Sequence, residues 1–228
     1  MTRTRVLRAV VGAAWIAAIL GLIALGTWQV HRRAWKLDLI ARVDARIHAA
    51  PVPAPTTAGK DDEYRRVRTT GRYLADKDTL VQASTVRGPG WWVMTPLASP
   101  NGTVLINRGY VPGRAPPAPP PGVVTVTGLL RLTEPGGGFL RHNDPAANRW
   151  YSRDVAAIAH ADRLRLAPYF IDADAAPAAT SQPVGGLTVV SFPNSHLVYA
   201  ITWYTLAIMT AAGLLYWITS LRRDRRRG

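Results

Sequence analysis

The chain has 228 residues, a formal net charge of +14 and only 18% charged residues. Soluble domains average about 25% charged residues, so this composition favours a protein that lies partly in lipid. The sequence contains no cysteine, which excludes disulfides, thiolate zinc sites and covalent attachment of c-type haem. Its three methionines supply too little soft sulfur for a copper(I) carrier.

The first long apolar segment covers residues 9–30, carries no charge and follows three arginines in residues 1–8. It is long enough to cross a bilayer as a helix, which takes roughly 20 apolar residues. A signal peptide has a similar basic start, but its apolar core is usually about 7–15 residues long, so we favour a retained transmembrane helix. Helical spacing of apolar residues continues to Ile47, and the prolines from Pro51 onward end the helix.

Residues 31–195 form the predicted extracytoplasmic domain, in which apolar and polar residues alternate as in β-strands. Asn101-Gly102 predicts a hairpin, because both residues accept positive φ. One short helix is expected after Asp154. Strands are predicted at residues 67–73, 79–84, 91–97, 103–109, 124–132, 169–171 and 188–190. The fold class that follows is a β-rich domain, a barrel or a sandwich, flanked by two transmembrane helices.

The second apolar segment runs from Leu197 to Leu221, with the predicted span at residues 197–219. The tail, residues 220–228, holds five arginines, and the positive-inside rule places it in the cytoplasm. Two spans then place residues 1–8 in the cytoplasm as well. Arg32, Arg33 and Lys36 follow the first span on the predicted outer side, against that rule, which indicates that they have a function there. No nucleic-acid-binding motif accompanies the basic ends, so nucleic acid is not an expected partner.

His196 lies at the start of the second span, and Tyr199, Ala200 and Trp203 follow it on one helical face. The histidine is either an interfacial anchor or an axial ligand to haem iron, since a neutral imidazole is a common ligand of that kind. Trp203 lies about 10 Å from His196 along a helix, so its indole would line a macrocycle rather than ligate it. Composition alone favours the anchor.

If each helix spans the membrane once, the end of the first helix lies at the same depth in the membrane as His196, the start of the second. Trp28 and Gln29 then lie at the level of His196, with Arg32 and Arg33 just beyond them.

Motifs of catalysis are missing: the sequence has no Gly-x-Ser-x-Gly, no HExxH and no P-loop. We therefore expect a protein that is not an enzyme.

Six segments in order along nearly the whole chain resemble the Surfeit locus protein one family (Shy-type proteins), which assists cytochrome c oxidase assembly. They are LGTWQ (25–29), YRRV (64–67), TPL (95–97), NRGYVP (107–112), NRWY (148–151) and NSHL (194–197). This chain departs from the family pattern at Tyr110, where tryptophan is frequent, and in the proline-rich loop at residues 114–122. The first helix starts near residue 9 with no transit-type segment before it, which points to a bacterial plasma membrane.

The resemblance implies a biogenesis factor that binds haem a at the outer membrane boundary and assists its insertion into the catalytic subunit of the oxidase. The family's ligand histidine matches His196, and its nearby tryptophan matches Trp203. Trp28 is expected as a second wall, and Arg32, Arg33 and Arg108 as partners of the haem propionates. The lipid bilayer, the catalytic subunit and haem a synthase are the expected partners. Two alternatives stay open: haem b in place of haem a, and a haem-free membrane scaffold for the oxidase subunit.

Overall fold

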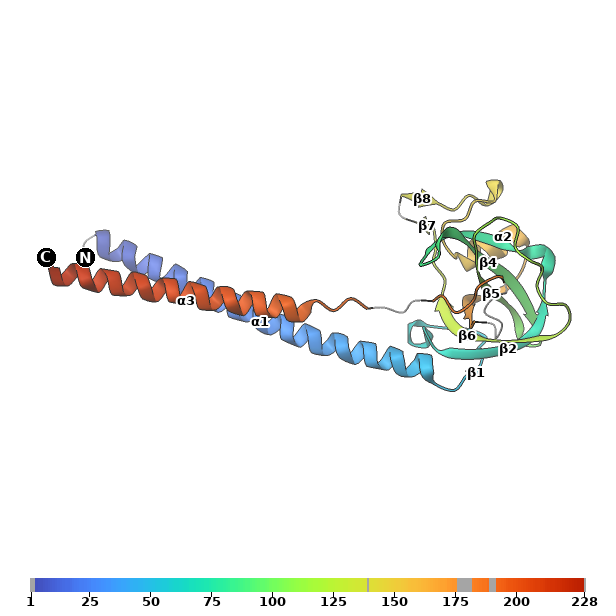
Figure 1. Ribbon diagram of the computed structural model, residues 1–228, viewed down its shortest axis with the longest axis horizontal. Coiled ribbons are helices and arrows are strands. Elements are labelled where there is room, and N and C mark those ends of the chain that lie inside the picture. The colour runs from blue at the N-terminus through green and yellow to red at the C-terminus, as the bar shows by residue number, and fades with distance from the viewer. Residues whose placement is uncertain (1–2, 139, 176–181, 189–191, 228) are drawn as a thin grey trace. The chain divides into compact units, whose positions relative to one another are not determined.

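A computed structural model describes residues 3–138, 140–175, 182–188 and 192–227 (Figure 1). The chain divides into two compact units. One consists of Met1–Arg42 with Ser191–Gly228, and the other of Val43–Val190.

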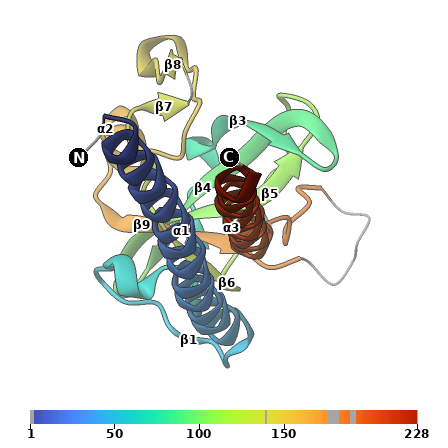
Figure 2. The same cartoon turned by 90° about the vertical axis from the view of Figure 1, so that its left-hand side faces the viewer.

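Two long helices, α1 (Arg3–His48) and α3 (His196–Arg227), make up most of the first unit. They run antiparallel and lie side by side, as both views show (Figures 1 and 2). A Cβ on Gly213 of α3 would lie 2.9 Å from the ring of Trp15 on α1, and a Cβ on Gly26 would lie 2.8 Å from Tyr204. Each glycine therefore leaves room for an aromatic ring of the facing helix to pack against its backbone.

Both helices are long and apolar enough to cross a membrane, which confirms the two predicted apolar helices. Only 6% of the apolar window of α1 and 11% of that of α3 is buried, so neither helix is the core helix of a soluble domain. α1 continues to His48 and ends before Pro51, because proline blocks further helix.

The second unit is a β-barrel. Its sheet has the strand order β1-β2-β6-β9-β5-β4-β3, and an additional β2–β4 pairing closes five strands, β2, β6, β9, β5 and β4, into a ring. The strand bounds are β1 Val52–Pro53, β2 Arg66–Tyr73, β3 Thr79–Thr85, β4 Gly88–Ser99, β5 Gly102–Val111, β6 Val124–Leu132, β7 Gly137–Gly138, β8 Arg141–His142 and β9 Leu166–Ala173. The short helix α2 covers Val155–Asp162, and single turns of 3-10 helix cover Lys60–Asp62, Ala75–Lys77 and Pro145–Ala147.

The barrel has two apolar clusters because side chains alternate across each strand. Ile106 of β5 and Ile171 of β9 belong to one cluster, together with the fully buried Leu130 of β6. Their neighbours Leu105 and Phe170 belong to the other cluster, which α2 completes through Ile158. Consecutive residues of one strand thus pack into different apolar layers.

Most of the predicted strands and the helix after Asp154 are present. The Asp154 carboxylate accepts from Ala157 N–H and caps α2, and β4 and β5 form the hairpin predicted at Asn101-Gly102, where Gly102 has φ +116°. The prediction of a strand at residues 188–190 is wrong at Thr188, which has no regular structure, and residues 189 and 190 lie outside the described residues. The Thr188 hydroxyl instead donates to Asp172, so a side-chain bond replaces the expected ladder.

Candidate functional site

α3 begins at His196, and this histidine is held by a residue of the other helix. Its Nδ1 lies 2.8 Å from Oε1 of Gln29 on α1, within hydrogen-bond range, and its side chain is half-buried. The hydrogen bond uses one ring nitrogen, so Nε2 is left for another partner. The structure thus brings together two residues that are 167 positions apart in the sequence.

His196 lies at one end of the contact surface between α1 and α3, which we call the seam. On α3 the seam continues through Ala200 and Ala207, which are 2% and 5% exposed. Ala200 lies four residues after His196, and Ala207 lies seven residues after Ala200, so all three lie on one face of the helix. Beside them, the hydroxyls of Tyr204 and Thr27 of α1 lie 3.1 Å apart in a hydrogen bond. The imidazole therefore faces the partner helix.

The cations that follow the first apolar segment fall on two faces of α1. Arg33 and Lys36 are four and seven residues after Gln29, on the same face, and like Gln29 they are half-buried. Lys36 Nζ lies 5.1 Å from the ring centroid of Phe192, four residues before His196. Arg32 is exposed and stacks on Trp35 instead, with its Cζ 4.0 Å from the ring centroid. Of the two predicted arginines, Arg33 is therefore the one on the Gln29 face.

The two predicted tryptophans also differ in position. Trp203 is half-buried and follows His196 by seven residues on the seam face of α3. Trp28 is 56% exposed, whereas its neighbour Gln29 is half-buried. The assignment of either indole to a haem wall stays a prediction.

Arg108, the third predicted cation, lies on β5 in the barrel unit with only 6% of its side chain exposed. Its guanidinium donates to the carbonyl of Pro117 at 2.9 Å, lies 3.4 Å from an Asp78 carboxylate oxygen and stacks over Tyr73. Burial lowers the pKa of Arg108 and raises that of Asp78, although the two opposite charges counteract both shifts. Burial also raises the pKa of Tyr73 to about 12. The contacts of Arg108 are thus with groups of its own domain.

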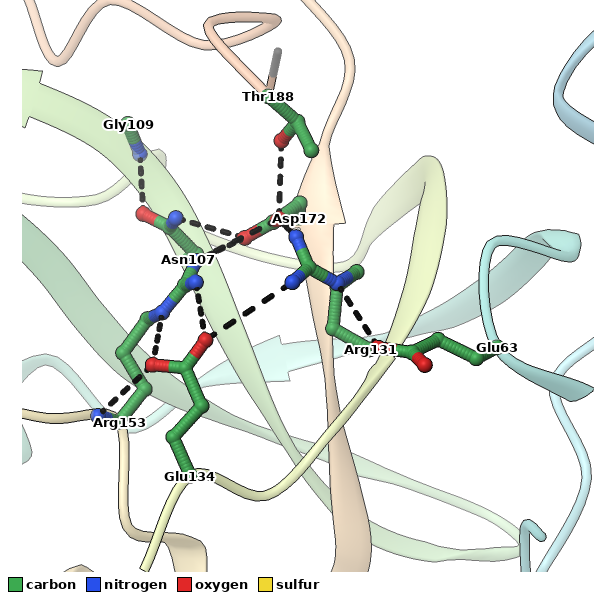
Figure 3. Close-up of polar contacts among 8 residues, drawn as sticks. All are labelled: Glu63, Asn107, Gly109, Arg131, Glu134, Arg153, Asp172 and Thr188. Atoms are coloured by element: carbon green, nitrogen blue, oxygen red, sulfur yellow. Dashed lines mark hydrogen bonds and ion pairs between the residues drawn. The ribbon is translucent and has the colours of Figure 1, made fainter. Parts of the chain in front are cut away.

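The barrel contains a buried ion network that the sequence patterns did not predict (Figure 3). At its centre is Asp172 of β9, which is 3% exposed. Its carboxylate accepts from Asn107 Nδ2 at 2.7 Å and from Arg131 and Arg153 at 3.2 and 3.1 Å. The network links β5, β6 and β9. The sequence signal is a charge inside or next to an apolar strand: Arg131 lies between two leucines, and Asp172 follows Phe170 and Ile171.

Two more carboxylates complete this network. Glu134 bonds to the Arg153 guanidinium, and Glu63 lies 3.6 Å from Arg131 Nε. Burial by itself would raise the pKa of Glu134, but the bonds from Arg153 outweigh it, so the pKa lies below its ordinary value. The Glu134 and Asp172 carboxylates in turn raise the pKa of Arg153 despite its burial. Each charge is paired, as buried charges require, so the network is interpreted as a structural tie between strands.

No group of three or more His, Asp or Glu side chains arranged to hold a metal ion occurs in the part of the chain that the structure describes. A single imidazole can still serve as the axial ligand of haem iron, because the porphyrin supplies the other ligands. Among the histidines that the structure describes, His196 has the geometry that suits such a ligand. It lies at the end of an apolar helix pair, and a neutral amide binds its second nitrogen.

Comparison with known proteins gives one consistent family. The profile of the SURF1 family matches residues 16–208, a range that includes Gln29, Arg33, Arg108 and His196. The chain is similar to Surfeit locus protein 1 of Rattus norvegicus, with 38% identity over 82% of this chain and 69% of the relative. It is 34% identical to Surfeit locus protein 1 of Homo sapiens over 86% of this chain and 74% of the relative. A SURF1-like protein of Monosiga brevicollis is 36% identical, with 82% and 80% covered.

Proposed function

The chain belongs to the SURF1 family, and we propose that it is a membrane-bound biogenesis factor that binds haem a and assists its insertion into the catalytic subunit of cytochrome c oxidase. The observation that carries the proposal is the position of His196. Its imidazole is half-buried at the mouth of two apolar helices and has one nitrogen occupied by Gln29.

The residues present fit a haem in three respects. His196 offers one nitrogen as an axial ligand, the half-buried Trp203 adds apolar surface below it, and Arg33 with Lys36 supplies positive charge on the facing helix. When bound, the haem supplies an iron with an axial position for the imidazole. A single protein ligand holds haem less tightly than two would, which suits a protein that must pass it on.

The packing of the seam restricts where haem can bind. Gly26 and Tyr204 are in such close contact that a Cβ on the glycine would lie 2.8 Å from the ring. A flat macrocycle therefore does not fit between the helices at that level. The proposed site is the end of the seam, at His196 and Gln29.

The proposed topology places this end at the outer boundary of a bacterial plasma membrane, with both termini in the cytoplasm. The arginines in the last turns of α3 support it, because basic residues are retained on the cytoplasmic side. Residues 31–195 would then face the compartment in which the outer part of the oxidase is exposed.

The proposal is tested by the absorption spectrum of the purified protein after coexpression with the enzymes of haem a synthesis. We expect a Soret band that His196→Ala abolishes. His31→Ala is the matched control, since His31 is an exposed histidine at the same end of the first apolar segment. A Soret band of full intensity in His196→Ala would refute the assignment of the ligand. Protein reconstituted with haem a and with haem b separately shows which of the two it binds.

A haem-free scaffold for the oxidase subunit is the second candidate, and one feature of the barrel favours it. Arg68 and Arg72 of β2 are exposed beside a groove of about 610 Å³ bounded by the β4–β5 hairpin. Neither arginine has an ion-pair partner among the residues that the structure describes. This candidate predicts that colourless protein still copurifies with the catalytic subunit, and that Arg68→Glu with Arg72→Glu weakens that association while His196→Ala does not.

A further inference from the structure

We infer that Gln29 is the positioning residue of His196: its amide oxygen holds the ring hydrogen on Nδ1 and leaves Nε2 as the lone-pair donor. The inference rests on the proposed function, because it gives Gln29 a role toward the haem that His196 is proposed to bind. It also makes a claim about the haem-free protein, which can be tested separately.

The chemistry of the two partners fixes the position of the ring hydrogen. A neutral imidazole carries one hydrogen, on either Nδ1 or Nε2, and the other nitrogen has the lone pair. An amide oxygen accepts hydrogen bonds and cannot donate them. Nδ1 of His196 lies 2.8 Å from Oε1 of Gln29, and a hydrogen bond between these two atoms requires the hydrogen on Nδ1. Nε2 then has the lone pair that an iron ligand needs.

The surroundings of this hydrogen bond favour its persistence. Both side chains are half-buried at the end of the seam, so water competes less for the amide oxygen than at an exposed site. Histidines that bind metals usually donate their second ring N–H to an acceptor, which fixes the tautomer and the ring orientation. Gln29 takes that position here, and it comes from the other helix, so the ligand is oriented only when α1 and α3 are paired.

The acceptor of the hydrogen bond is a neutral amide and not a carboxylate. A carboxylate in this position would make the imidazole a more basic and stronger ligand, whereas an amide raises its basicity less. A carrier must release its haem, so the weaker acceptor is consistent with transfer. Gln29→Glu should accordingly keep the ring orientation and strengthen the bond to iron.

The experiment begins with the full chain without haem, labelled with ¹⁵N and placed in detergent micelles. Long-range ¹⁵N–¹H correlations of the imidazole distinguish the two tautomers. We expect the Nδ1–H form to dominate for His196 and to give way to the Nε2–H form in Gln29→Leu. Thr27→Val is the matched control, because it removes the hydrogen bond to Tyr204 from the same seam without contacting His196. A wild-type protein in the Nε2–H form, or an unchanged tautomer in Gln29→Leu, overturns the inference.

The second part uses the haem-loaded protein. Gln29→Leu should shift the iron–histidine stretching band in resonance Raman spectra to lower frequency and weaken haem binding about tenfold, the lower end of the usual loss of such a partner. Gln29→Glu should move the band to higher frequency and bind haem at least as tightly as the wild type, and Thr27→Val should change neither the band nor the binding. If His196→Ala keeps its haem, the proposed ligand fails while the tautomer result still stands. If haem depends on His196 but not on Gln29, the inference fails by itself.

Discussion

The Arg153 guanidinium lies 3.1 Å from the Asp172 carboxylate, and the aspartate side chain is only 3% exposed. This ion pair connects the segment before α2 to β9. Because Asp172 also accepts from β5 and β6, one carboxylate joins three strands of the ring. A buried charge with this many partners is costly to leave unpaired.

Asp172→Ala should therefore lower the free energy of unfolding by about 3–5 kcal/mol, because both buried arginines lose a partner. The measurement is denaturant unfolding of the full chain in detergent, followed by tryptophan fluorescence. Asp174→Ala is the control, since Asp174 pairs with Arg66 where both side chains are about one third exposed. Its loss should cost at most about 1 kcal/mol. Equal effects of the two substitutions would contradict the structural role of the network.

The Glu134 carboxylate predicts a loss of stability in acid. Its pKa in the folded protein is below the ordinary value of 4.5, because Arg153 outweighs the effect of burial. A lowered pKa means that the unfolded chain binds more protons, so the contribution is complete above pH 4.5 and declines as the pH falls through the folded-state pKa. Thermal unfolding from pH 6 downward should show a smaller decline in Glu134→Gln than in the wild type. An identical pH profile would show that Glu134 is not coupled to folding.

Arg108 should matter for folding and not for haem. Its guanidinium is already bound to Pro117 and Asp78, so Arg108→Met should cost about 1.5–3 kcal/mol by removing a charge-assisted bond from the half-buried Asp78 carboxylate, which keeps its bond from Thr95. The Soret band per folded protein should be unchanged. Arg33→Met is the comparison, because Arg33 lies on the face of α1 that Gln29 shares, and we expect it to weaken haem binding. Loss of haem in a well-folded Arg108→Met protein would instead assign Arg108 to the propionates.

Gly26 should be intolerant of a side chain. A Cβ at this position would lie 2.8 Å from the Tyr204 ring, so Gly26→Ala should overpack the seam at a cost of about 1–3 kcal/mol. Gly21→Ala is the control, since nothing lies within 4 Å of its Cβ and the gain in helix propensity is the same at both sites. Thermal unfolding in detergent gives the difference. Equal stability of the two variants would mean that the helices are not in contact at Gly26.

The sequence alone predicted the elements that depend on local patterns. Long apolar segments indicated α1 and α3, alternation indicated the main strands, and Asn101-Gly102 indicated the hairpin. These features follow from neighbouring residues, so no tertiary information was needed. His196 and the tryptophan seven residues later were selected in the same way, from their spacing on one helix.

Only the tertiary structure decided which distant groups meet. Three contacts or exposures depend on how two separate elements are rotated and packed. They are the hydrogen bond between Gln29 and His196, the exposure of Trp28 and the ion pair between Arg108 and Asp78. The same holds for the closure of the ring through β2 and β4 and for the pairing around Asp172. A sequence pattern specifies which face of an element is apolar, but polar contacts within a few ångströms arise only once those faces are packed against each other.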